Sequence, residues 1–263
     1  MEENEIRRAN RAALPKLLLF MVLCLAVGGT AGYFAARYGL NTLTGNLKSA
    51  GAFFGSNVAP YLLLAVAVLS PAVCFSIYRG AKKRIAAWDG EDEAVYEAID
   101  RRLSTVNRIS ASALVLSYFL LAASYSGGFG IFESRRLTVL YFLAIAAFFA
   151  VIIETLLLGQ RCVDAVKRVN PEKKASFYDM NFQKKWMEDC DEAEKLLIGR
   201  CAYRAYRATN RVCAILAGVC ALGALLFDIG FLPSLAVCSI WIVSQSAYCR
   251  EAMKYAKLGN RLS

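Results

Sequence analysis

Residues 137–159 read LTVLYFLAIAAFFAVIIETLLLG, an apolar run with a single charged residue, Glu154. A helix rises about 1.5 Å per residue, so roughly 20 such residues cross the hydrocarbon layer of a bilayer, which is about 30 Å thick. The run is long enough to do so. It therefore predicts a transmembrane helix.

Five further apolar runs have the lengths expected of membrane spans once tilt is allowed. They cover residues 14–36, 58–78, 109–125, 212–227 and 232–248. The chain is 57% hydrophobic with a mean hydropathy of +0.42, which is high for a soluble domain. The sequence predicts an all-α polytopic protein, in which residues 1–263 form one integral membrane domain of about six helices.

Positive charge is distributed unevenly between the two sides of the predicted membrane. Of the 31 Lys and Arg, 26 fall before the first span, in the loops 79–108 and 160–211, or after the last span, and Lys16 lies near the start of the first span. The remaining four are Arg37, Lys48, Arg135 and Arg136. Such residues gather on the cytoplasmic side of membrane proteins. We expect a multi-pass protein of the cell membrane with both termini in the cytoplasm. The net charge of +10 is then a consequence of topology and does not indicate a nucleic-acid partner.

Several kinds of chemistry are excluded by missing residues. The chain has no histidine, which removes His-based metal sites and the Ser-His-Asp triad. It also lacks the glycine-rich phosphate loop, the protein-kinase motifs and the GxSxG motif of hydrolases. We therefore expect no catalytic residues, no cofactor and no metal, and we do not expect an enzyme.

Glu154 is the charged residue whose position in a span most needs an explanation, because a carboxylate at mid-membrane costs roughly 2.5 to 3.5 kcal/mol on insertion scales. One interpretation is a proton or cation site, with Ser244 and Gln245 of the last span as further polar groups. The other is that Glu154 reaches the headgroups or a basic residue near Arg161, while Ser244 and Gln245 hydrogen-bond between helices. The sequence favours the second interpretation.

The two basic loops carry helical patterns. In the first, residues 89–108 begin with an acidic cap, which is followed by apolar residues at helical spacing, Val95, Ile99, Leu103 and Val106. In the second, a helical pattern begins at about Asp189. Both patterns continue into a predicted span, so each loop should end in a cytoplasmic helix. In contrast, residues 41–57 are rich in Gly, Ser, Thr and Asn and are expected to form an outer connection.

Four arginines form a stripe in the second basic loop. Their spacing of four, three and four residues places them on one face of a helix: Arg200, Arg204, Arg207 and Arg211. A phosphate-bearing ligand or nucleic acid is one interpretation. Anionic lipid headgroups, each charge contributing about 1 kcal/mol, explain a basic face at the cytoplasmic leaflet more simply.

Several segments carry a family resemblance. They are residues 170–174, 178–180, 182–186, 190–195 and 241–249. With them, the chain resembles the bacterial family called domain of unknown function thirty-one sixty-nine over nearly its whole length. The resemblance implies a multi-pass membrane protein without an assigned activity, and no residue roles are carried over from it.

These observations favour a non-enzymatic membrane protein with a scaffold or regulatory role through its cytoplasmic helices. Its expected partners are the lipid bilayer, anionic headgroups at the cytoplasmic face, and either a second copy or another membrane protein. The small-residue pattern at residues 28–32 suits a homodimer or tight packing within the chain. The alternative is a small transporter or channel component that uses Glu154 and the polar patch at residues 244–246.

Overall fold

The structure is a computed structural model that describes residues 41–88, 92–125, 134–170, 172–227 and 230–262, with isolated residues between 15 and 37 and Phe132. The side chains of residues 255–262 and of a few positions near helix ends are not described. The chain divides into two compact units, residues 48–200 and residues 1–47 with 201–263. Each unit is described by itself.

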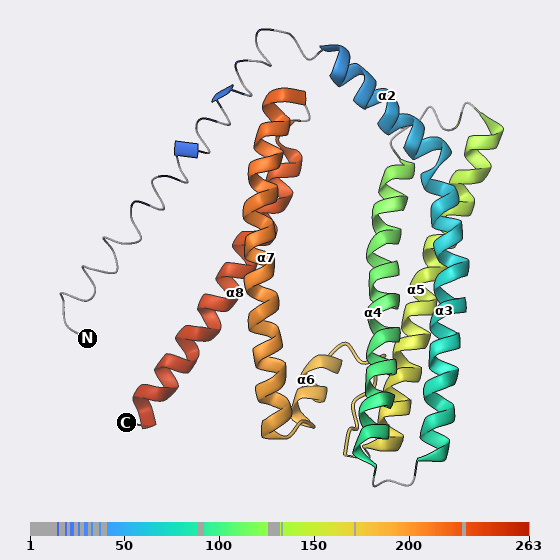
Figure 1. Cartoon of the computed structure of the whole chain (residues 1–263), viewed down its shortest axis with the longest axis vertical. Helices are drawn as coiled ribbons and strands as arrows, with labels where there is room; N and C mark the ends of the chain where they lie inside the picture. The colour runs from blue at the N-terminus through green and yellow to red at the C-terminus, as the bar shows by residue number, and fades with distance from the viewer. Residues whose placement is uncertain are drawn as a thin grey trace. The chain divides into compact units, whose positions relative to one another are not determined.

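The described residues form helices and no strands. The helices are α2 (Asn41–Asn57), α3 (Ala59–Ala87), α4 (Glu93–Ser124), α5 (Arg135–Val169), α6 (Phe182–Glu188), α7 (Glu192–Phe227) and α8 (Leu232–Leu262) (Figure 1). The predicted all-α class is confirmed for this part of the chain. Helix α7 passes from one unit into the other.

Four stretches of helix are long and apolar enough to cross a membrane: Ala59–Ala87, Ala94–Ser124, Arg135–Val169 and Leu232–Lys254. They contain the predicted spans 58–78, 109–125, 137–159 and 232–248, apart from the end residues Val58 and Tyr125. The chain is therefore a membrane protein.

The predicted number of six spans is not confirmed. Most of the predicted span 14–36 lies outside the described residues. The predicted span 212–227 lies within α7, but α7 is not among the four apolar stretches found in the described part. Residues 225 and 226, near the end of this run, are among the positions whose side chains are not described.

In residues 48–200, helices α3, α4 and α5 pack together as a three-helix bundle (Figure 1). One buried cluster occupies the end near the start of α3, and its members are Ala59, Leu63, Leu120, Ala144, Ala147 and Phe148. A second occupies the other end, with Cys74, Ala81, Ile99, Leu103, Val106, Leu158, Cys162 and Ala165. We call this second end, with residues 79–88, 92–108 and 160–170, the basic end.

Helix α4 begins within the acidic segment in which the sequence predicts a cap. Asp92 is the N-cap, and its side chain accepts hydrogen bonds from the backbone N–H of Ala94 at 2.9 Å and of Val95 at 3.4 Å. The helix then continues without a break to Ser124. Ile99 and Leu103 are buried as their spacing predicts. The hydrophobic core of the bundle thus continues beyond the predicted span into the charged segment.

Two segments differ from the sequence-based expectation. Residues 41–57 form helix α2, where a connection was expected. Only Val58 separates α2 from α3, and Phe54 packs against the first buried cluster, so packing and direct continuation into α3 outweigh the poor helix propensity of the Gly and Asn residues. The short helix α6 was also not predicted, since a helix of 7 residues is too short to show a periodic pattern.

Candidate functional site

Glu154 has a hydrogen-bonding partner inside the bundle. The hydroxyl of Ser70 on α3 donates a hydrogen bond of 2.9 Å to Oε1 of Glu154 on α5. The second carboxyl oxygen, Oε2, is buried and has no partner among the described residues. No Lys or Arg of the described part lies within ion-pair distance of Glu154. A carboxyl group with one free oxygen can bind a proton or a water molecule there.

A groove of about 640 Å³ lies beside this carboxyl group, between α3 and α5. Its walls are almost entirely apolar, and Glu154 and Arg161 supply the charged groups. Arg161 and Arg79 both lie over the ring of Phe75, at 5.7 and 4.3 Å from its centre. A single carboxyl group in apolar surroundings can take up one proton, but it provides no chain of groups along which a proton could be relayed.

Gln245 belongs to the other unit and has its own partner there. Its Oε1 accepts a hydrogen bond of 2.5 Å from the hydroxyl of Tyr206 on α7. The Tyr206 ring also stacks on Tyr248 of α8, with ring centres 4.5 Å apart. Ser244, one residue before Gln245, is half-buried. These contacts join α7 to α8, as expected of hydrogen-bonding residues between helices.

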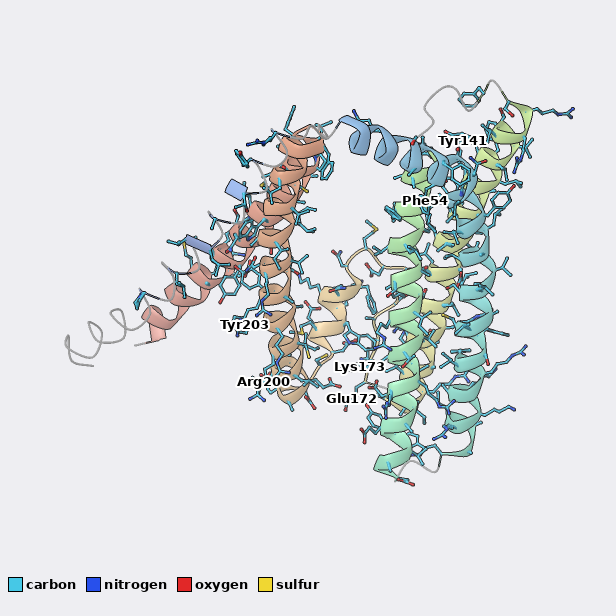
Figure 2. All side chains as sticks on the ribbon, turned by 45° about the horizontal axis from the view of Figure 1, so that its top comes forward. Phe54, Tyr141, Glu172, Lys173, Arg200 and Tyr203 are labelled. Atoms are coloured by element: carbon cyan, nitrogen blue, oxygen red, sulfur yellow. The ribbon has the colours of Figure 1, made fainter. Side chains whose placement is uncertain are left out.

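The arginine stripe lies on α7, the helix that its spacing predicts. Arg200, Arg204, Arg207 and Arg211 are all exposed, and none of them forms an ion pair in the described part of the chain. Arg200 and Tyr203 project from this helix in Figure 2. The stripe is available to an external anion, and its lipid or ligand role stays a prediction.

A cluster that sequence reasoning missed lies at Lys173, between α5 and α6 (Figure 2). Its side chain is only 3% exposed. The ammonium donates hydrogen bonds to the carbonyl of Asp189 at 3.2 Å, to Sγ of Cys190 at 3.1 Å and to the carboxylate of Glu194. We call Lys173, Asp189, Cys190 and Glu194 the clasp. It fastens the segment that follows α5 to the start of α7.

The clasp shifts the pKa values of its charged groups. Partial burial disfavours the charged form of Lys173, but hydrogen bonds to Glu194 and Cys190 outweigh it and raise the lysine pKa above its ordinary value. Burial also disfavours ionised Glu194, but its interactions with Lys173 and Cys190 prevail and lower the pKa of this carboxyl group. Both residues are therefore charged across the neutral range.

The segment between α5 and α6 is also held at its backbone. The Asp189 carboxylate accepts hydrogen bonds from the N–H of Lys174 at 2.7 Å and of Ala175 at 3.2 Å, and the first of these is the main cause of its lowered pKa. Gln160 of α5 accepts a hydrogen bond of 2.8 Å from the N–H of Phe177. Backbone donors in an irregular segment need such partners, so these two side chains fix its path.

No sequence motif predicts the clasp. Lys173 stands in a basic aromatic stretch, where a solvated lysine is the usual outcome. The available signal was the acidic group at residues 188–194, which follows that stretch closely enough to meet it in a tight loop. Among the described residues, no three His, Cys, Asp or Glu side chains lie close enough together to hold a metal ion.

Comparison with known proteins gives one match. A family model described as "Protein of unknown function (DUF3169)" matches residues 11–251. The chain belongs to this family. The DUF3169 region contains Glu154, the arginine stripe, the clasp and all of the described helices except the end of α8. No curated protein and no solved structure matches this DUF3169 chain.

Proposed function

We propose that this DUF3169 protein is a non-enzymatic multi-pass protein of the cell membrane, with a scaffold or regulatory role through its basic end. We propose that the basic end and both termini are cytoplasmic, because nearly all of the Lys and Arg lie on that side of the predicted spans. The proposed partners are anionic lipid headgroups and a protein, either a second copy or another membrane protein. No cofactor or nucleic acid takes part.

The observation that carries this proposal is the clasp. A nearly buried lysine with three hydrogen-bonding partners holds residues 172–191 in one conformation beside the bundle. A segment that is ordered before binding loses less conformational entropy when a partner arrives. The polar groups of this segment are used to build a fixed surface, and they do not converge on a cavity.

The fixed segment presents apolar side chains on its surface. Met180 is fully exposed and Tyr178 is 58% exposed. Methionine and tyrosine are enriched in protein interfaces, because both provide apolar contact area that adapts to a partner. Exposed charges follow them along the chain on α6, where Lys184 is 79% exposed and Glu188 is 63% exposed. This arrangement suits an apolar contact with a polar rim.

A photo-cross-linking amino acid placed at Met180 in living cells tests the proposal. We expect a discrete protein adduct from this position and none from the exposed Lys82, which serves as the matched control at the same end of the bundle. An adduct of twice the 28.9 kDa chain mass would identify a second copy. Disrupting the clasp with Glu194→Gln should weaken the adduct. Equal adducts from Met180 and Lys82 would contradict the proposal.

The second candidate function is transport, and the free Oε2 of Glu154 beside the groove between α3 and α5 favours it. Flux of protons and cations into liposomes containing the protein distinguishes the two functions. Flux that is lost in Glu154→Gln and kept in Ser70→Ala would support transport through the carboxyl group. The scaffold proposal expects no flux from any of the three proteins.

A further inference from the structure

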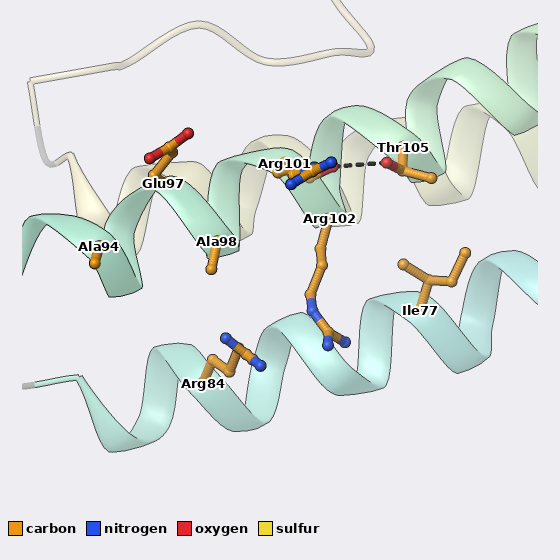
Figure 3. A pocket seen from close by; sticks show the side chains of 8 residues that line it. All are labelled: Ile77, Arg84, Ala94, Glu97, Ala98, Arg101, Arg102 and Thr105. Carbon is orange, nitrogen blue, oxygen red and sulfur yellow. Dashed lines mark hydrogen bonds between the residues drawn. The ribbon is translucent and has the colours of Figure 1, made fainter.

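A second groove, of about 570 Å³, lies between α3 and α4 at the basic end (Figure 3). Three arginines line it: Arg84 comes from α3, while Arg101 and Arg102 come from α4. Ala94 and Ala98 of α4 also face it, and their small side chains leave space between the two helices. We call this space the arginine groove. It is distinct from the groove beside Glu154.

Arg102 is positioned in this groove by close packing. Its guanidinium lies directly against the backbone of α3 at Gly80, in the space that a Cβ atom at position 80 would occupy. Figure 3 shows the Arg102 side chain crossing from α4 toward α3, where the Arg84 side chain also lies. A residue larger than glycine at position 80 would displace this guanidinium. Two guanidinium groups from different helices therefore face the same space.

The charges of the arginine groove are not neutralised within the described part of the chain. None of its three arginines forms an ion pair there. Glu97 is the single acidic residue in the lining, so the groove carries two net positive charges. Three lysines beyond α5 differ, since Lys173, Lys185 and Lys195 each have a carboxylate partner. The positive charge of the arginine groove is thus available to an external anion.

We propose that the arginine groove binds a phosphate-bearing anion. Guanidinium groups bind phosphate oxygens through paired N–H donors, and arginines from two helices can grip one phosphate from two sides. The volume of the groove lies within the range of small-molecule sites, roughly 300 to 1,000 Å³. A carboxylate ligand would satisfy one arginine, whereas a phosphate group offers enough oxygens for several.

The depth of the groove allows two sources of phosphate. Arg84 lies five residues beyond Arg79, the residue after the predicted span, which is about 7.5 Å along the helix. The headgroup layer of one leaflet is roughly 5 to 7 Å thick. A terminal phosphate on a lipid headgroup and a soluble phosphate compound can both reach this depth. The inference deepens the proposed function, on which it rests, by naming the ligand of the basic end.

The full-length protein in detergent would be titrated with inorganic pyrophosphate by calorimetry. The same protein in nanodiscs would be compared with and without phosphatidic acid in phosphatidylcholine, by native mass spectrometry of the retained lipid. Arg84→Gln/Arg102→Gln should weaken binding about a hundredfold, roughly tenfold for each charge-assisted hydrogen-bonding group that is removed. If the variant binds pyrophosphate more weakly than the wild type does, the ligand is a soluble phosphate compound. If the variant loses affinity for phosphatidic acid alone, the ligand is a lipid.

Matched variants separate recognition from general charge. Lys82→Gln/Lys83→Gln removes the same charge from exposed residues of α3 that do not line the groove and should change binding less than about twofold. Arg84→Lys/Arg102→Lys keeps the charge but loses the paired donors, and we expect about tenfold weaker binding. Gly80→Ala retains all three arginines and should weaken binding several-fold by displacing Arg102. This variant still tests the proposal if Arg84→Gln/Arg102→Gln fails to fold.

The proposal is overturned if neither probe binds, or if Lys82→Gln/Lys83→Gln weakens binding as much as Arg84→Gln/Arg102→Gln. Either result would leave the cross-link at Met180 unaffected. Conversely, if phosphate binding is intact and that cross-link is absent, the proposed protein partner is rejected. The proposal that the arginine groove binds phosphate then stands. The two proposals therefore fail separately.

Discussion

The ammonium of Lys173 and the carboxylate of Glu194 are in contact but differ in exposure. The lysine side chain is 3% exposed and the glutamate side chain is 37% exposed. Removing the partner of a buried charge leaves that charge without compensation, which costs more than the ion pair itself contributes. Water can replace Lys173 around Glu194, but it cannot replace Glu194 around Lys173. The two ends of this ion pair should therefore respond differently to mutation.

Glu194→Gln should destabilise the protein by about 3 kcal/mol, because it leaves the Lys173 ammonium buried with neutral acceptors alone. Lys173→Met should cost only about 1 kcal/mol, since water can replace the ammonium around Glu194 and a thioether can contact the Trp186 ring over which the ammonium lies. Thermal unfolding in detergent would show an apparent midpoint lowered by roughly 6 to 12 °C for Glu194→Gln and by roughly 2 to 4 °C for Lys173→Met. The double variant should be more stable than Glu194→Gln alone. The reverse order of the two single variants would contradict this account.

The clasp should be intact over a broad pH range and open at both extremes. Glu194 and Asp189 have pKa values lowered from 4.5 and 3.8, so their stabilisation is present above these values and is lost as the pH falls through the lower folded-state pKa. Lys173 has a raised pKa, so its contribution is complete below 10.5 and is lost as the pH rises through the folded-state pKa. Both transitions would be followed by the fluorescence of Trp186, in a variant whose other tryptophans, Trp88 and Trp241, are replaced by phenylalanine. Glu194→Gln should weaken the acid transition, and an unchanged acid transition would show that Glu194 is not its source.

At the scale of elements, α5 organises the larger unit. It packs against α3 and α4, and its Glu154 accepts a hydrogen bond from Ser70 of α3. Its Gln160 accepts a hydrogen bond from the backbone of Phe177, in the segment that follows α5. Gly159 precedes Gln160 and lies against the ring of Phe177, which also packs edge-on against Phe182 of α6. The absence of a side chain at position 159 is thus required for the segment to approach the helix.

Gly159→Ala should loosen this segment, because the new Cβ would lie 2.5 Å from a ring carbon of Phe177 and the ring would have to move. We expect a loss of about 1 to 3 kcal/mol and faster proteolysis within residues 172–191. Gly199→Ala on α7 is the control, since no atom lies within 4 Å of its added Cβ. That change should stabilise the helix by roughly 0.5 to 1 kcal/mol. Equal stabilisation by both substitutions would show that Phe177 does not pack closely at Gly159.

At the scale of the whole molecule, two properties of the sequence act together. Apolar stretches in α3, α4, α5 and α8 make the chain a membrane protein. Charged residues gather at one end of the α3–α5 bundle, where helices with their own buried cluster extend past the apolar stretches. The orientation that this charge asymmetry predicts can be measured directly.

Single cysteines introduced into a chain whose nine native cysteines are changed to alanine report this orientation. A membrane-impermeant maleimide should label Arg135→Cys in intact cells, because this residue precedes the apolar stretch of α5 at the expected outer side. Lys82→Cys, at the basic end, should be labelled only after the cells are lysed. Labelling of Lys82→Cys in intact cells would reverse the proposed topology.

The sequence by itself determined the all-α class, the four apolar stretches and a capped helix within residues 89–108, because hydropathy, helical period and capping are local properties of the chain. It also singled out Glu154, since a carboxylate in an apolar run is visible without a structure. It did not identify Ser70 as the partner of Glu154, and it did not predict α2 or α6.

Only the tertiary structure decided which polar groups meet. Ser70 and Glu154 are 84 residues apart, and Arg84 and Arg102 come from different helices. Lys173 is buried because Asp189, Cys190 and Glu194 surround it, and nothing in its own neighbourhood along the chain distinguishes it from a solvated lysine. Burial and pairing depend on which helices pack together, and that is a property of the folded chain as a whole.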